Sequence, residues 1–187
     1  MKRKFPRARA LAVCKELCPL LQPFTERLVV AGSLRRGCGE VGDIELVYVP
    51  KVERRPVIGD MFATNLVDLA ELEIRRMIEV GILDLRPSST GVTTFGAKNK
   101  LTTHVETGIP VDFFATVESS WFNYLVCRTG PKESNMRIAE AAQLKGWRWN
   151  PYGSGFTGPR GEAHEVRSEQ DVFEFVGLPC REPKERV

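Results

Sequence analysis

Two acidic residues, Asp43 and Glu45, lie one position apart at the start of a β-rich run, and this pair constrains the fold more than any other feature. Because side chains alternate along a strand, both carboxylates leave the same face while their apolar neighbours enter the core. A third acid, Asp112, is flanked by similar apolar residues, which predicts another core strand. Like charges held this close are costly unless a cation neutralises them, and hard oxygen ligands select Mg²⁺ or Mn²⁺.

A Gly-Ser turn, Gly32 and Ser33, precedes the acidic pair at the end of an earlier β-rich run. A glycine at such a turn leaves backbone N–H groups free to face an anion. Arg35 and Arg36 lie on the same turn, where one guanidinium group would suffice to bind phosphate oxygens. The spacing from Ser33 to Asp43 allows a helical turn and a return into the next strand. Together these signals predict phosphoryl transfer assisted by two metal ions about 4 Å apart.

The composition is that of an ordinary globular chain. Of 187 residues, 42% are hydrophobic and the formal net charge is +3, which excludes a disordered or collagen-like protein. No apolar run approaches the roughly 18 residues that a membrane-spanning helix needs, and the charged start lacks the apolar core of a secretory signal. The five cysteines include no Cys-x-x-Cys pair. We therefore expect a cytoplasmic protein with reduced thiols and no membrane partner.

Apolar periodicity and turn residues divide the chain into an α+β domain, residues 1–117, and a smaller domain, residues 118–187. In the first domain, they predict helices at 6–21 and 64–80. They also predict strands around 27–31, 44–49, 82–86, 91–96, 100–106 and 109–116. In the second, they predict helices at 119–127, 133–145 and 168–176, the last capped by Ser168. The aromatic residues of the Gly/Pro-rich segment between them are expected to pack in a core: Trp147, Trp149 and Tyr152.

The order of the motifs resembles the nucleotidyltransferase superfamily of DNA polymerase beta, in its family X form. The signature of that superfamily is Gly-Ser, then Asp-x-Asp or Asp-x-Glu, then a distal Asp. Residues 32–37, residues 42–45 and Asp112 are similar to it. The resemblance implies a polymerase beta-like palm, with a mixed sheet and helices, followed by a small α/β thumb-like lobe.

The likeness continues through the second half of the chain. Residues 128–131 resemble the Thr-Gly nucleotide-binding turn of the family, and Asn135 resembles the asparagine that touches the incoming base. Residues 146–156 and 171–186 resemble the nucleotide-selecting thumb and the terminal family signature. Only some thirty residues precede Gly32, so the form is similar to the minimal palm-plus-thumb members of viruses and phages, and we expect no lyase activity.

The resemblance implies roles for individual residues. Asp43, Glu45 and Asp112 would bind two Mg²⁺ ions, with Mn²⁺ as a substitute, and Asp112 would accept the proton of a primer 3′-hydroxyl. The incoming nucleotide would be bound by Gly32, Ser33, Arg36, Gly42, Gly130 and Asn135. The DNA would be contacted by Lys98, Lys100 and Arg137, the two lysines alternating on one strand and sharing a face.

Glu45 and the pair Cys127 and Arg128 are among the departures from the family pattern. Glu45 replaces the usual Asp, and its longer side chain still reaches a metal. Cys127 and Arg128 replace the aromatic pair that lines the sugar pocket. We expect this replacement to weaken discrimination against ribonucleotides, because the flat apolar surface beneath the ribose is lost.

We therefore expect a monomeric, metal-dependent DNA polymerase. It would transfer a nucleoside monophosphate from a (d)NTP to a primer 3′-hydroxyl with release of pyrophosphate, in short-gap filling during DNA repair. Its partner would be a DNA primer-template or a gapped duplex. Two alternatives remain open: a nucleotidyltransferase that acts on a tRNA end or a small-molecule hydroxyl, and a catalytically degenerate DNA-binding module.

Overall fold

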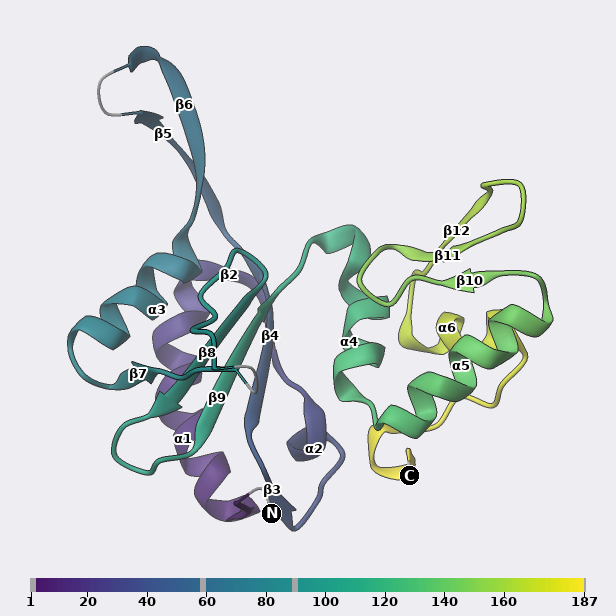
Figure 1. Cartoon of the computed structure of the whole chain (residues 1–187), viewed down its shortest axis with the longest axis horizontal. Helices are drawn as coiled ribbons and strands as arrows, with labels where there is room; N and C mark the ends of the chain where they lie inside the picture. The colour runs from purple at the N-terminus through teal and green to yellow at the C-terminus, as the bar shows by residue number, and fades with distance from the viewer. Residues whose placement is uncertain (1–2, 58–59, 89–90, 187) are drawn as a thin grey trace.

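The computed structural model describes residues 3–57, 60–88 and 91–186. Its first lobe is built on a five-stranded mixed sheet (Figure 1). The strand order is β2-β4-β9-β8-β7. Their bounds are β2 (Thr25–Val30), β4 (Ile44–Pro50), β7 (Leu83–Leu85), β8 (Asn99–His104) and β9 (Pro110–Ala115). Neighbours are antiparallel except β4 and β9, which run parallel. The α+β fold class predicted for the chain is confirmed.

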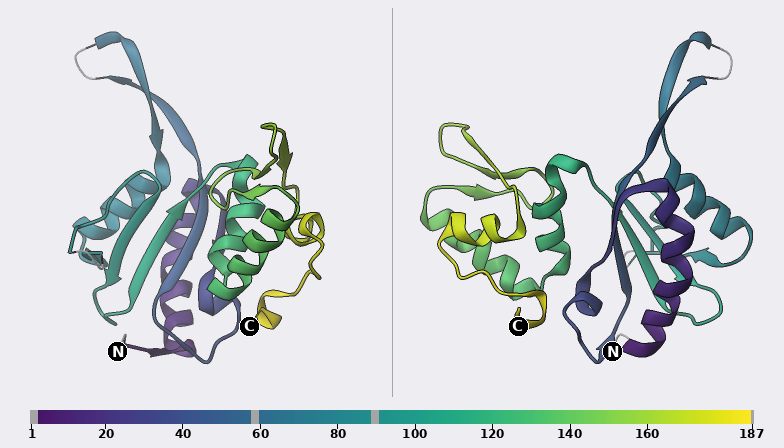
Figure 2. Two further views of the ribbon diagram at one scale, coloured as in Figure 1. Left: turned by 45° about the vertical axis from the view of Figure 1, so that its right-hand side comes forward. Right: turned by 180° about the vertical axis from the view of Figure 1, so that it is seen from behind.

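Two helices, α1 (Arg7–Leu21) and α3 (Leu69–Glu79), share one core with this sheet (Figure 2). Their buried apolar side chains form a single cluster with Leu46 and Tyr48 of β4 and with Phe113 of β9. These strand residues are alternate ones, so they leave the same face of the sheet. Alternate residues of β4 and β9 are therefore buried in the core that the two helices form with the sheet.

The intervening strand residues face the other way. Val47 and Phe114 form a separate apolar cluster with side chains of α4 (Trp121–Thr129), the helix that follows the sheet. Glu45 and Asp112 lie two positions before them on the same strands, and so point from the same face. The alternation thus directs both acids away from the α1 and α3 core, toward the side that α4 covers.

A long hairpin of β5 (Val52–Val57) and β6 (Asp60–Asp68) projects from the first lobe (Figures 1 and 2). The helix predicted over 64–80 is wrong in its first residues, which belong to β6. Helix α3 begins only after Asp68, because the Asp68 carboxylate caps it by accepting a hydrogen bond from the Glu71 N–H at 2.8 Å. The strand predicted over 91–96 is also wrong: its described residues form isolated bridges only.

Short elements complete the first lobe: β1 (Phe5–Pro6) paired with β3 (Glu40–Val41), the four-residue helix α2 (Gly32–Arg35), and the 3-10 helix η1 (Gln22–Phe24). The helical turn that the spacing from Ser33 to Asp43 allows is present as α2, which begins at Gly32. Among the described residues, no helix combines the length and the apolar character that crossing a bilayer requires.

The second lobe packs helices against a small antiparallel sheet, and it has its own apolar core around Ile138, Phe156 and Val172. Its elements are α4, α5 (Lys132–Leu144), β10 (Arg148–Trp149), β11 (Gly155–Thr157), β12 (Ala163–Glu165), α6 (Glu169–Val176) and the 3-10 helices η2 (Glu118–Ser120) and η3 (Pro183–Glu185). The cap predicted at Ser168 is confirmed, since its hydroxyl accepts a hydrogen bond from the Asp171 N–H at 3.0 Å. The division into domains near residue 117 stays a prediction.

One charged cluster ties the two lobes together. Arg35 of α2 donates to Glu169 of α6 at 3.0 Å and to the Thr129 hydroxyl at 2.7 Å. Arg186, near the end of the chain, donates to the same Glu169 carboxylate at 3.0 Å. Burial alone would raise the pKa of Glu169, but the two guanidinium groups hold it below its ordinary value. Glu169 is therefore ionised and shared between two arginines.

We predict that Glu169→Gln destabilises the protein at neutral pH by about 2 kcal/mol and reduces its sensitivity to acid. A carboxyl whose pKa is lower in the folded state stabilises the protein above its unfolded value, near 4.3, and this contribution disappears as the pH falls through the folded value. Urea unfolding at a series of pH values measures both effects. The matched control is Glu165→Gln, at an exposed glutamate of the same lobe. An acid dependence equal to that of the unaltered protein would contradict the prediction.

Candidate active site

The parallel pairing of β4 with β9 places two of the predicted acids opposite each other. Glu45 on β4 and Asp112 on β9 are direct register partners. Asp43 immediately precedes β4, and both aspartates act electrostatically on Glu45. The structure therefore brings the three acids together at the amino-terminal half of two neighbouring strands.

The Gly-Ser turn lies directly against Glu45. Gly32 has a φ of +60°, and a Cβ atom added to it would come within 1.9 Å of Oε2 of Glu45. A larger residue would both collide with the carboxylate and adopt an unfavourable backbone conformation. The backbone N–H of Ala31 donates to the Glu45 carbonyl at 2.8 Å, which fixes the turn to the strand. The structure thus brings the turn and the acids together, as their spacing predicts.

The surroundings of Glu45 favour a bound cation. The pKa of Glu45 is raised to about 7, chiefly by burial and also by the carboxylates of Asp43 and Asp112. The guanidinium groups of Arg128 and Arg36 oppose this shift. A carboxylate that is desolvated beside other carboxylates is stabilised in its ionised form by positive charge nearby.

Arg86 forms an ion pair with Asp112 that no sequence motif predicts. Its Nη2 atom donates to Oδ1 of Asp112, and its Nε atom donates to the Thr102 carbonyl at 3.3 Å. The side chains are 27% and 13% exposed, so the pair is only partly buried. Arg86 reaches this place because its backbone N–H bonds to the carbonyl of Leu101, the register partner of Asp112. A metal ion at Asp112 would have to share the carboxylate with Arg86.

The donor set suits a divalent cation. Asp43, Glu45 and Asp112 supply hard carboxylate oxygens, which Mg²⁺ and Mn²⁺ prefer. Within the part of the chain that the structure describes, no three His, Cys, Asp or Glu side chains are grouped closely enough to hold a metal ion as they stand. The residues therefore fit the metal by donor type and by neighbourhood, and their role as ligands stays a prediction.

A cleft of about 560 Å³ opens beside Glu45, between the two lobes. Its walls include Arg36, Glu45, Arg128, Gly130, Asn135 and Tyr152. This volume lies in the range of sites that hold a nucleotide-sized ligand. The cleft thus brings together three of the residues predicted to bind the nucleotide: Arg36, Gly130 and Asn135. It also contains Glu45, an acid predicted to bind metal.

The two arginines of the Gly-Ser turn have separate environments. Arg36 lines the cleft, and its Nη1 atom donates to the Thr129 carbonyl. Arg35 is engaged by Glu169 in the contact between the lobes. If one of the two arginines binds phosphate in the cleft, as predicted, it is therefore Arg36. Ser33 is partly buried within α2.

The two glycines predicted to bind nucleotide lie at turns next to these groups. Gly42 is buried and directly precedes Asp43. Gly130 ends α4 with a φ of +60°, and a Cβ atom added there would be 3.3 Å from Nη1 of Arg36. The Gly130-Pro131 peptide bond is cis. Each glycine thus borders a charged side chain of the candidate site.

Asn135 is fixed at the start of α5 by a hydrogen bond from Nδ2 to the Cys127 carbonyl at 2.8 Å. Its Oδ1 atom is buried and has no hydrogen-bond partner among the described residues. One half of the amide is therefore used to join α5 to α4, and the other half is an acceptor inside the cleft wall.

Arg128 fills the place next to the predicted sugar pocket. Its guanidinium group stacks 3.5 Å from the ring centre of Phe114 and lies 5.3 and 5.5 Å from those of Tyr124 and Tyr152. The core position predicted for Tyr152 is wrong, because its side chain is 55% exposed and lines the cleft, whereas Trp149 is buried as predicted. The sequence pattern missed Tyr152 because this residue lies in the turn after β10, beyond the strand alternation on which its burial was predicted.

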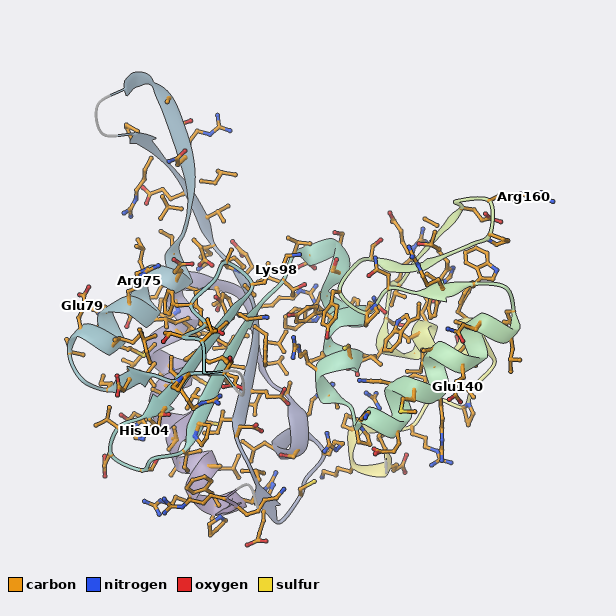
Figure 3. The ribbon with its side chains drawn as sticks, in the orientation of Figure 1. Arg75, Glu79, Lys98, His104, Glu140 and Arg160 are labelled. Atoms are coloured by element: carbon orange, nitrogen blue, oxygen red, sulfur yellow. The ribbon has the colours of Figure 1, made fainter. Side chains whose placement is uncertain are left out.

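The three residues predicted to contact DNA differ in exposure. Lys98 is exposed just before β8 (Figure 3). It lines a hollow that also includes Tyr124 and Tyr152. Arg137 is exposed on α5. The prediction for Lys100 is wrong: the residue is fully buried, and its Nζ atom bonds to two backbone carbonyls and pairs with Glu71 at 3.2 Å. The inward face of β8 here is covered by α3, which strand alternation alone does not reveal.

We predict that Lys100→Ala destabilises the protein by about 3 kcal/mol, because it removes one member of a buried ion pair and leaves Glu71 without this partner. Lys98→Ala removes the same charge at an exposed position, two residues before Lys100. It should change the free energy of unfolding by less than about 0.5 kcal/mol. Chemical denaturation followed by circular dichroism compares the two. Equal effects of the two substitutions would show that the burial assigned to Lys100 is incorrect.

The chain is similar in sequence to known DNA polymerases. Residues 124–187 match the family model described as DNA polymerase beta thumb. The chain is 28% identical to DNA polymerase lambda of Arabidopsis thaliana over an alignment of 204 residues. That alignment covers the whole of this chain but 37% of the relative, so the chain spans little more than a third of the relative's length.

The fold is also similar to a solved structure. The crystal structure of Leishmania infantum polymerase beta, described as a ternary P/T complex, matches with a TM-score of 0.73 and 19% sequence identity. The match covers 99% of this chain and 77% of that chain. The chain therefore has a polymerase beta type of fold, and its residues 124–187 are similar to the DNA polymerase beta thumb.

Proposed function

We propose that this protein is a family X polymerase-like, metal-dependent nucleotidyltransferase that extends a DNA primer. It would add a nucleoside monophosphate from a (d)NTP to the primer 3′-hydroxyl and release pyrophosphate. The observation that carries the proposal is the register of Glu45 against Asp112, with Gly32 packed on the Glu45 carboxylate at the edge of a nucleotide-sized cleft. The solved relative described as a ternary P/T complex supports a primer-template as the partner.

The chemistry is one of charge and position. Asp43, Glu45 and Asp112 would hold two Mg²⁺ ions, or Mn²⁺, which when bound would stabilise the negative charge that develops on the transferred phosphoryl group. Carboxylates that repel each other when alone are suited to this task, because their mutual repulsion is relieved by the cations. We therefore propose that the grouping of carboxylates that makes Glu45 difficult to ionise is also the feature that binds the metal ions.

Asp112 would accept the proton of the attacking 3′-hydroxyl. Its ion pair with Arg86 holds the carboxylate in one orientation on β9. Arg86 is thus proposed as a positioning residue for Asp112.

The triphosphate would lie between the Gly-Ser turn and the cleft wall. Ser33 and the backbone of the turn would donate to phosphate oxygens, and Arg36 would supply the positive charge. Arg36 already borders Gly130 and the Thr129 carbonyl, so it would hold the phosphates at the junction of the two lobes. The Asn135 amide oxygen would accept a hydrogen bond from the incoming nucleotide.

Lys98 and Arg137 are the exposed cations proposed to contact the DNA backbone. They lie on different lobes, so a duplex held by both would contact both lobes. Short-gap filling in DNA repair, action as a monomer and a cytoplasmic location complete the proposal. Arg128 in place of a flat aromatic surface supports acceptance of ribonucleotides as well as deoxyribonucleotides.

The test is extension of a labelled primer on a gapped duplex with a single nucleotide and Mg²⁺. We predict extension by the unaltered protein and a loss of at least about 100-fold in rate for Asp112→Asn, because the proton acceptor and a metal ligand are removed together. Asp84→Asn, at an exposed residue of β7, is the matched control and should retain the rate. The same assay with ribonucleotides and with Mn²⁺ defines the sugar and metal preferences.

The alternatives give different results in this assay. A nucleotidyltransferase acting on a tRNA end or a small-molecule hydroxyl would leave the primer unextended and label its own acceptor. A degenerate module would retain the duplex in a gel-shift experiment without extending it. Either result from the unaltered protein would overturn the proposed polymerase activity.

A further inference from the structure

A second, smaller hollow lies on the opposite side of helix α5 from the candidate active site. Its volume is about 140 Å³, and its walls include Ser134, Arg137, Phe173, Leu178, Arg181 and Arg186. The cleft beside Glu45 uses Asn135 and Ala139 of the same helix. At about 100° per residue, those two residues and the pair Ser134 and Arg137 lie on opposite faces of α5. The two spaces are therefore separate.

The most informative wall residue is Arg186. Its side chain is 3% exposed, although arginine is rarely buried without full pairing. The Nε atom donates to the Arg181 carbonyl at 2.9 Å, and Nη2 donates to Glu169 at 3.0 Å. The third nitrogen, Nη1, is buried and has no hydrogen-bond partner among the described residues. An unsatisfied buried donor on a cation is costly, so a ligand that accepts from it would be favoured.

The charged residues in the wall of the hollow are arginines. Arg35 and Arg186 share the single carboxylate of Glu169. Arg137 and Arg181 add two further guanidinium groups at the wall, and no carboxylate is among the wall residues that the structure describes. Several arginines around one hollow are typical of sites for phosphate or carboxylate groups.

The size and the remaining walls narrow the class of ligand. A volume of about 140 Å³ is well below the 300 Å³ or more of pockets for nucleotide-sized molecules, but it can hold one tetrahedral oxyanion. Phe173 and Leu178 give the hollow an apolar side, and the Arg186 guanidinium group lies 5.0 Å from the Phe173 ring centre. Reduced contact with water strengthens the attraction between the arginines and an anion.

We infer that this hollow on the second lobe binds one phosphate group, with Nη1 of Arg186 as the buried donor and Arg181 and Arg137 as the charged rim. The phosphate can come from solution or from a nucleic-acid strand, because the rim arginines are exposed and either source presents the same oxygens. The inference concerns a site apart from the acids and does not depend on polymerase activity.

The test follows the arginine side-chain resonances of the full-length protein by NMR during addition of inorganic phosphate. We predict that the Arg186 signals shift in a saturable way. Arg181→Ala should weaken binding about threefold, through the loss of one rim charge. Arg186→Lys, checked for folding by circular dichroism, should weaken it about tenfold or more, because lysine keeps the charge but not the third donor nitrogen.

The matched control is Arg160→Ala. Arg160 is an exposed arginine of the same lobe and lies at the tip of the loop between β11 and β12 (Figure 3). The Arg160→Ala substitution should leave phosphate binding unchanged. The inference is overturned if no probe moves the Arg186 signals, or if Arg160→Ala weakens binding as much as Arg181→Ala does, which would show non-specific screening.

Two single-stranded oligonucleotides of one sequence, with a 5′-phosphate or a 5′-hydroxyl, distinguish the sources. Tighter binding of the phosphorylated strand assigns the site to a terminal phosphate, and equal binding of the two assigns it to a backbone phosphate. Binding of inorganic phosphate alone assigns it to the free ion. Each of these results supports a phosphate site at Arg186.

Discussion

The parallel pairing of β4 with β9 is the constraint on which the candidate site depends. It sets Glu45 opposite Asp112, and strand alternation then fixes what lies on each face. Leu46 and Phe113 enter the core under α1 and α3, while the acids point to the face that α4 covers. A shift of one residue in this register would exchange the two sets, so the apolar core and the position of the acids are determined together.

This arrangement has an electrostatic cost that arginines partly offset. Burial and two neighbouring carboxylates raise the pKa of Glu45 to about 7, and Arg36 and Arg128 act against this. Arg86 pairs with Asp112 on the other strand. A fold selected only for stability would have little reason to place three acids on one face of adjacent strands. The grouping is understandable if a doubly charged cation and a polyphosphate enter the site together.

The sequence predicted the parts of the site that depend on local pattern. The alternation of Asp43 and Glu45, the turn at Gly32 and the strand around Asp112 all follow from short motifs, and the α+β fold class from the order of elements. Arg86 and the burial of Lys100 could not be predicted, because both depend on which strands and helices become neighbours. The start of α3 was misplaced since Leu66 fits helical spacing although it is 68% exposed on the hairpin.

The central claim is that these acids hold a divalent cation, and Mn²⁺ binding followed by electron paramagnetic resonance tests it most directly. In the presence of a nucleotide, the account predicts that Glu45→Gln and Asp112→Asn each weaken Mn²⁺ binding by at least about tenfold. The exposed Glu165→Gln variant should bind as the unaltered protein does. Mn²⁺ affinity that is unchanged by either substitution at the acids would contradict the account.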